Sequence, residues 1–135
     1  MKVVLDCNVL IAAGLKDGVC REAIFEVVSK HTNYVSDEIF LEYKEVIQRE
    51  KFIKFSGYLT TLLKIICESS KWLAPTNRIN LRLPDQSDAM YLELALAAKA
   101  KYLITGNARH FPDRQYSGTS IISPAEFLKV TRASS

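Results

Sequence analysis

The sequence has few of the cysteine and histidine residues that form disulfide bonds or bind zinc. Its 135 residues include only three cysteines, two histidines, five glycines and four prolines. Cys7, Cys20 and Cys67 are odd in number and widely spaced, with no C-x-x-C pair among them. We therefore expect reduced thiols, and neither a disulfide framework nor a zinc site.

Long apolar runs are also missing. No stretch approaches the roughly 20 apolar residues that a membrane-spanning helix needs, and the apolar start of the chain is interrupted at Asp6. We expect a soluble, cytoplasmic protein with no membrane contact. Its composition, with 48% hydrophobic and 24% charged residues, is typical of a single globular domain covering residues 1–135.

Charge of one sign is not abundant either. The formal net charge of +3 is too small by itself to indicate a nucleic-acid-binding protein. If the acidic residues gather in one site, however, the surface around that site is more basic than the total suggests. The local potential is therefore the relevant quantity.

Short apolar segments alternate with longer helical patterns along the chain. This alternation predicts an α/β fold in which helices cover both faces of a parallel sheet. The expected strands are 3–5, 34–35, 72–74, 102–105 and 120–122. The expected helices are 20–28, a segment capped by Ser36 and continuing to 47, 58–69, 88–100 and 124–130, with a turn at 14–18 and a loop at 106–118.

Polar residues follow the predicted strands where a parallel sheet brings strand ends together. Asp6 ends the first strand, Asp88 begins the helix before the fourth strand, and Asn107 follows that strand through Thr105. Glu42 lies about 9 Å below the start of its helix at 1.5 Å per residue, so its long side chain can reach the same edge. We expect these side chains to share one crevice.

A buried acid such as Asp6 costs several kcal/mol unless a partner compensates its charge. Carboxylates packed together raise one another's pKa, and a divalent cation is the simplest way to keep them ionised. A ligand set of oxygen atoms without His or Cys favours Mg²⁺ or Mn²⁺. Each residue also has a simpler explanation when taken alone: Asp88 as a helix N-cap, Glu42 as a solvated partner of Lys44 or Lys64, and Asp85 as a turn residue.

Four motifs occur in a fixed order along the chain. They are Val-Val-Leu-Asp6-Cys-Asn8, Ser36-Asp-Glu-Ile-Phe-Leu-Glu42, Pro84-Asp-Gln-Ser-Asp88 and Leu-Ile-Thr105-Gly106-Asn107, followed by the ending Ser123-Pro124-Ala-Glu-Phe127-Leu. Together they resemble the PIN domain family, in its toxin branch of toxin-antitoxin pairs, the VapC-like ribonucleases. The resemblance covers nearly the whole chain.

This resemblance implies a metal-dependent endoribonuclease with a central parallel sheet in the strand order 3-2-1-4-5. It implies that Asp6, Glu42 and Asp88 are catalytic, metal-binding carboxylates, and that Asn8 orients Asp6 or a water molecule. It also implies an RNA substrate, a small antitoxin partner and a homodimer or higher homo-oligomer.

The chain departs from the family pattern at two positions. The family commonly has a fourth acid after Thr-Gly, where this chain has Asn107, a neutral metal ligand or hydrogen-bond donor that lowers the negative charge of the site by one. Cys7 stands where Thr is usual, and we expect its side chain to turn away from the site.

Other residues are expected around the mouth of the site. Thr105 and Asp85 are expected as supporting residues, and Phe111 as a ring for an unstacked base. The candidate substrate-binding residues share a positive charge or a titratable ring, and they are Lys16, Arg78, Arg82, Arg109 and His110.

Two other functions remain open from the sequence. Asn107 favours a catalytically weak PIN-like module that binds RNA or a protein. The D-x-N spacing of Asp6 and Asn8 also loosely resembles the D-x-D motif of haloacid-dehalogenase-type phosphatases, although Asn8 cannot act as their general acid.

Overall fold

The computed structural model describes residues 1–79, 82–83 and 85–133. Pro84, part of the third motif, lies outside the described residues. Within these ranges no helix is long and apolar enough to cross a membrane.

A six-stranded sheet forms the centre of the described structure, in the order β3-β2-β1-β4-β6-β5. Its strands are β1 (Lys2–Leu5), β2 (Thr32–Val35), β3 (Lys71–Trp72), β4 (Tyr102–Ile104), β5 (Gln115–Tyr116) and β6 (Thr119–Ile122). β1 pairs in parallel with β2 and β4, β2 with β3, and β4 with β6. The predicted α/β class and the order of the five parallel strands are confirmed.

The sheet differs from the prediction at one edge, where β5 pairs antiparallel with β6. The predicted loop 106–118 therefore contains a strand of a hairpin. The two residues that connect β5 to β6, Ser117 and Gly118, have φ angles of 45° and 92°. A two-residue loop with both φ angles positive matches the twist of a β-hairpin, and the Ser-Gly pair is the sequence signal for it.

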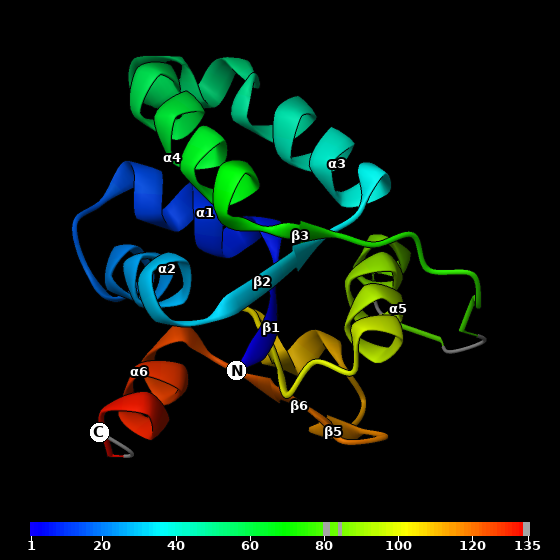
Figure 1. Ribbon diagram of the computed structural model, residues 1–135. Helices are drawn as coiled ribbons and strands as arrows, with labels where there is room; N and C mark the ends of the chain where they lie inside the picture. The colour runs from blue at the N-terminus through cyan, green and yellow to red at the C-terminus, as the bar shows by residue number, and fades with distance from the viewer. Residues whose placement is uncertain (80–81, 84, 134–135) are drawn as a thin grey trace.

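Helices cover both faces of the sheet, as predicted. They are α1 (Cys7–Leu15), α2 (Val19–Lys30), α3 (Asp37–Ile47), α4 (Ser56–Ser69), α5 (Ala89–Ala98) and α6 (Pro124–Ala133), with short 3₁₀ turns η1 (Glu50–Phe55), η2 (Gln86–Asp88) and η3 (Ala108–His110). Figure 1 shows α2 and α6 on one side of the strands and α5 on the other. α5 packs against β1, β2 and β4, and α2 packs against β2 and α6.

The central strand β1 is apolar because it is buried on both faces. Val3, Val4 and Leu5 are at most 1% exposed. At its end the backbone N–H of Asp6 still bonds to the Ile104 carbonyl at 3.0 Å, so the register with β4 fixes where the acid emerges.

Two helix starts explain how acids reach this edge of the sheet. Ser36 caps α3 as predicted, since its hydroxyl accepts the Ile39 N–H at 3.2 Å. Before α5, Asp85 caps the short turn η2 by accepting the Ser87 N–H at 3.0 Å. Asp88 makes no side-chain capping bond to α5, so the N-cap explanation of this residue does not hold and its carboxylate is directed elsewhere.

Candidate active site

Asp6 leaves the sheet at the junction of β1 and α1. It is the N-cap of α1, where its carboxylate accepts the Asn8 N–H at 3.4 Å. The other carboxylate oxygen accepts the Thr105 hydroxyl at 2.8 Å. The side chain is nearly buried, with 5% of the residue exposed. Asp6 is therefore held by the strand β1, the first turn of α1 and the end of β4 together.

Thr105 and Asn8 form a network that orients Asp6. The Thr105 oxygen accepts the Asn8 side-chain N–H at 3.4 Å and the Asn107 backbone N–H at 3.0 Å. Because both lone pairs of this oxygen accept hydrogen bonds, the hydroxyl group can interact with Asp6 only as a donor. The Asn8 carbonyl oxygen in turn accepts the Gly106 N–H at 3.0 Å. Asn8 and Thr105, the residues expected to support the site, thus bond to Asp6 and to each other.

Glu42 lies on α3 and is fixed by a residue of α5. The Tyr91 hydroxyl donates to Glu42 Oε1 at 2.5 Å. Tyr91 is fully buried, whereas Glu42 is half-buried. The bond ties α3 to α5 across the sheet edge.

Asp88 closes the group at the end of η2. His110 of η3 contacts Asp88 Oδ2 through its Nδ1 atom at 3.2 Å. Because Asp88 is only 8% exposed, this contact covers an acid that has little access to water. His110, expected as a substrate-binding residue, is thus a direct neighbour of a candidate metal ligand.

These side chains line a single cleft of about 520 Å³. Its polar lining residues are Asp6, Asn8, Glu42, Arg49, Asp85, Ser87, Asp88, Asn107 and His110. Its other lining residues are Cys7, Ile11, Ala12, Leu15, Val46 and Phe52. The structure therefore brings together the acids that the sequence places on separate elements.

The acids in the cleft influence one another. Burial raises the pKa of Asp6 to about 6, the charges of Asp88 and Glu42 add to the rise, and the bonds from Thr105 and Asn8 oppose it. Burial also raises the pKa of Glu42, again with a contribution from Asp88. The mutual repulsion expected of carboxylates gathered in one site is thus a property of this cleft.

The donor set suits a hard divalent cation. Three carboxylates and the Asn107 amide offer only oxygen ligands on this wall, the kind that Mg²⁺ and Mn²⁺ prefer. Within residues 1–79, 82–83 and 85–133, no group of three His, Cys, Asp or Glu side chains lies close enough to hold a metal ion as it stands.

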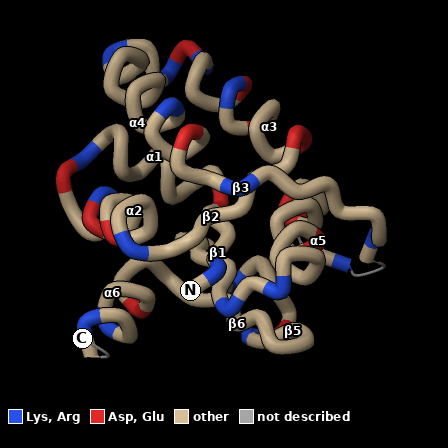
Figure 2. The backbone as a smooth tube through the Cα atoms, viewed as in Figure 1, with Lys and Arg blue, Asp and Glu red and all other residues tan. Residues whose placement is uncertain are grey.

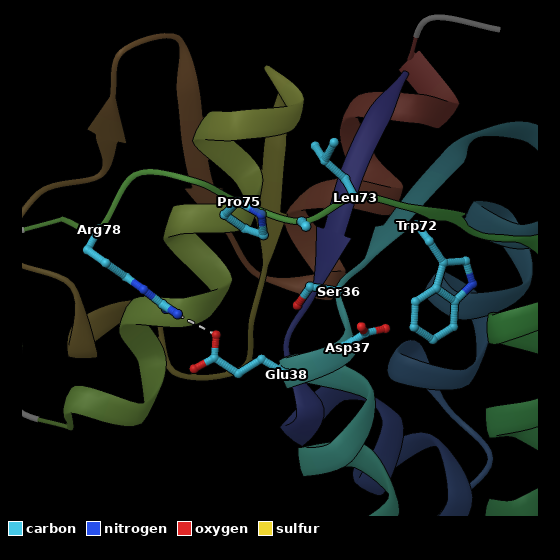
Figure 3. A pocket seen from close by; sticks show the side chains of 8 residues that line it. Ser36, Asp37, Glu38, Trp72, Leu73, Pro75 and Arg78 are labelled. Atoms are coloured by element: carbon cyan, nitrogen blue, oxygen red, sulfur yellow. Dashed lines mark hydrogen bonds and ion pairs between the residues drawn. The ribbon is translucent and has the colours of Figure 1, made fainter.

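The lysine and arginine residues expected around the site do not line the cleft. Arg78 forms ion pairs of 3.1 Å with Glu38 and with Glu93, and it lines a different pocket beside Trp72 and Pro75 (Figure 3). Lys16, Arg82 and Arg109 are exposed and do not line the cleft. Figure 2 shows cationic and acidic residues interspersed along the helices on the visible side of the molecule.

The structure corrects the expectations for the ring of Phe111 and the thiol of Cys7. Phe111, expected as a surface for a base, is 4% exposed and belongs to the core. Cys7, expected to turn away, lines the cleft and is 5% exposed. Burial raises the pKa of the Cys7 thiol to about 12, so it stays protonated and is no nucleophile at neutral pH.

Among the residues that sequence reasoning missed, Tyr91 bonds to Glu42, and Arg49 and Phe52 line the cleft. Tyr91 lies three positions after Asp88, and Arg49 lies seven after Glu42, two residues beyond the end of α3. Phe52 sits in η1, directly after the helix that carries Glu42. The spacing of these residues from the acids was a possible signal. An aromatic residue that belongs to no motif, however, is more often part of the core than of a site.

The fold and the cleft define an α/β protein with an acidic site at the carboxyl edge of a parallel sheet. The PIN domain model matches residues 2–109, and the chain belongs to the PIN domain family. This family is generally one of nucleases that use divalent metal ions.

A solved structure agrees with this assignment at the level of the fold. A chain in the crystal structure of VapBC2 from Rickettsia felis, bound to a DNA fragment from their promoter, is 14% identical with a TM-score of 0.62. The match covers 91% of this chain and 98% of that one. No curated protein sequence matches the chain.

Proposed function

We propose that this protein is a Mg²⁺- or Mn²⁺-dependent endoribonuclease and the toxin of a toxin-antitoxin pair. The observation that carries the proposal is the convergence of Asp6, Glu42 and Asp88, from three separate elements, on one cleft. Their raised pKa values mean that the ionised cluster is destabilised without a counter-charge. A divalent cation is the counter-charge that phosphodiester hydrolysis also needs.

The proposed roles follow from the contacts of each residue. Asp6, Glu42 and Asp88 hold the ion, and Asn107 adds a neutral oxygen beside them. A bound divalent ion supplies an activated water and neutralises charge on the phosphoryl oxygens. Thr105 keeps the orientation of Asp6 fixed through its 2.8 Å bond.

Three further residues support the site from its rim. Asn8 holds the loop at Gly106 in place, and Asp85 shapes the turn that presents Asp88. His110, 3.2 Å from Asp88, lines the same cleft and would contact a phosphate of the substrate there.

The partners of the protein belong to the same proposal. An RNA strand is the substrate, and a small antitoxin made with the toxin binds over the cleft and blocks it. The neighbouring structure, VapBC2, is a complex bound to promoter DNA, which supports a pairing of this kind. We further propose that the protein is cytoplasmic and acts as a homodimer or a higher homo-oligomer.

A second candidate function is a PIN-like module that binds RNA or a protein without cutting. Two observations favour it: Asn107 in place of an acid, and carboxylates spaced too widely in the described residues to hold a metal ion as they stand. The phosphatase alternative has less support. The amide of Asn8 is not a general acid, and it serves instead to bond to Thr105 and Gly106.

Cleavage of single-stranded RNA separates these functions. We expect the protein to cut a labelled RNA with Mn²⁺, and to lose the activity in excess chelator or with Asp88→Asn. Asp37→Asn is the matched control, since Asp37 is an acid at a helix start that does not line the cleft. Cutting that persists in chelator contradicts the metal mechanism, and an intact fold that binds RNA without cutting supports the module.

The toxin role has its own test. Induced expression of the protein should arrest growth of a bacterial host, and co-expression of the product of a short adjacent reading frame should relieve the arrest. Asp6→Asn should be harmless in the same assay. Growth arrest by Asp6→Asn equal to that of the unchanged protein contradicts the role.

A further inference from the structure

The connection between α3 and α4 combines basic and aromatic residues. Residues 49–55 read Arg-Glu-Lys-Phe-Ile-Lys-Phe, with three cations against one acid. Most of this segment forms η1, and it runs between α3 and α4 in Figure 1. Phe55 is 39% exposed and Ile53 is 69% exposed, so the segment presents apolar as well as charged surface.

Part of this segment belongs to the cleft that holds the acids. Arg49 and Phe52 line it, together with Ile11, Leu15 and Val46. The lining of the cleft therefore combines two kinds of side chain: the carboxylates of Asp6, Glu42 and Asp88, and apolar side chains that are joined by one cation. We call the second group, Ile11, Leu15, Val46 and Phe52 with the cation Arg49, the apolar wall.

The cations of the segment stand beside the ring of Phe52. The Lys51 ammonium lies 5.1 Å from the centroid of that ring. The Arg49 guanidinium makes two bonds to the Glu45 carboxylate, at 2.9 and 3.3 Å, on the exposed surface. Lys51 is exposed, whereas Arg49 contacts an anion at the rim of the cleft in exchange for Glu45.

We propose that the apolar wall binds one unpaired base of an RNA strand, with Phe52 as the stacking ring and Arg49 and Lys51 as contacts for the adjoining phosphates. The inference rests on the proposed function and names how that site takes its substrate. A nucleotide whose phosphate lies beside Arg49 and Lys51 can place its base within the same cleft of about 520 Å³. The apolar wall is the surface that remains for its base.

An RNA strand fits these residues better than an apolar protein segment does. Aromatic rings interleaved with cations are the pattern that binds single strands, because the ring stacks a base while the cations follow the backbone. A base within a duplex is already stacked on both faces, so it offers no free face to the ring of Phe52.

Binding without cleavage isolates this site. In Asp6→Asn protein with EDTA present, we would measure fluorescence anisotropy of a labelled single-stranded oligoribonucleotide of mixed sequence. Removal of a ring that stacks one base lowers the affinity for a single strand by about fivefold to a hundredfold. Phe52→Leu should therefore weaken binding of the oligomer by at least about fivefold. Phe55→Leu, the matched change in the same segment but outside the cleft, should bind like its parent.

Leucine is chosen because it keeps an apolar side chain and preserves the fold, which a melting curve of each variant checks. A base stacks only on the aromatic ring, whereas an apolar protein segment would pack almost as well against leucine. Lys51→Gln should weaken binding and reduce its salt dependence, and Lys129→Gln on α6 should do neither.

Three results overturn the inference. The first is equal binding by Phe52→Leu and Phe55→Leu. The second is an abasic oligomer that binds as tightly as the complete one, which makes the apolar wall a face for a protein partner instead. The third is no measurable binding of the oligomer by the parent. Cleavage with Mn²⁺ is measured separately, so a protein that binds as expected and does not cut refutes the proposed function alone.

Discussion

The Tyr91 hydroxyl donates a hydrogen bond of 2.5 Å to Glu42 Oε1, joining a fully buried residue of α5 to an acid of α3. Burial raises the pKa of Glu42, and this bond opposes the rise. It also occupies one of the two carboxylate oxygens. Tyr91 therefore sets both the charge and the free oxygen that Glu42 offers to the cleft.

Removal of the Tyr91 hydroxyl should make Glu42 harder to ionise. In Tyr91→Phe the pKa of Glu42 rises further, so the pH at which Mn²⁺ binding reaches half its maximum should move upward. Titration calorimetry with Mn²⁺ between pH 5 and 8 measures this shift. Tyr43→Phe is the control: its hydroxyl bonds to the Leu5 carbonyl, so it should cost about 1 kcal/mol of stability and leave the pH profile unchanged. Identical profiles for the two variants refute this role of Tyr91.

The pKa of Asp6, raised to about 6 in the fold, makes stability depend on pH. An acid whose folded pKa is raised binds its proton more tightly when folded, so the free energy of unfolding falls as pH rises from about 4 to 6 and is level above. The rise of about two units corresponds to roughly 3 kcal/mol. Asp6→Asn should therefore be more stable than the parent at pH 7.5 by up to about 3 kcal/mol. Urea unfolding at pH 4.5 and 7.5 measures it, and a slope that Asp6→Asn leaves unchanged contradicts the assignment.

Asn107 determines how much charge the site carries. Asn107→Asp adds a carboxylate where the family commonly has one, so Mn²⁺ affinity should increase by about tenfold, within the range of effects seen for groups around a metal site. Without metal the same change adds repulsion and should lower the melting temperature. Asn77→Asp, an exposed amide outside the cleft, should do neither. An affinity that does not change shows that Asn107 is no ligand.

Gly14 allows α1 to pack closely against α4. A Cβ atom at this position would lie 2.1 Å from Leu59 Cδ2, and Leu59 is fully buried. Gly14→Ala should therefore destabilise the fold by about 1–3 kcal/mol despite the better helix propensity of alanine. Gly18→Ala meets no atom within 4 Å and should be nearly neutral. Thermal unfolding compares the two, and the packing argument fails if both are neutral.

The sequence predicts the acidic side of the cleft because backbone topology alone places it. Asp6 follows a buried strand, Asp88 precedes a long helix, and parallel strands end at one edge. The supporting position of Thr105 follows from the same rule. These inferences need no knowledge of side-chain contacts.

The rest depends on tertiary contacts that no spacing rule supplies. Arg78 does not line the cleft, and its guanidinium pairs with Glu38 and Glu93. Phe52 enters the cleft because the turn after α3 folds back, where the N–H of Phe52 bonds to the Arg49 carbonyl at 2.9 Å. The strand β5 was missed because it has two residues and depends on its hairpin turn.

Titration of the protein with Mn²⁺ by calorimetry at pH 7.5 tests the central claim most directly. The account predicts saturable binding that Asp6→Asn and Asp88→Asn each abolish and that Asp37→Asn retains. Absence of Mn²⁺ binding by the folded, unchanged protein, or binding that survives both cleft substitutions, would contradict it.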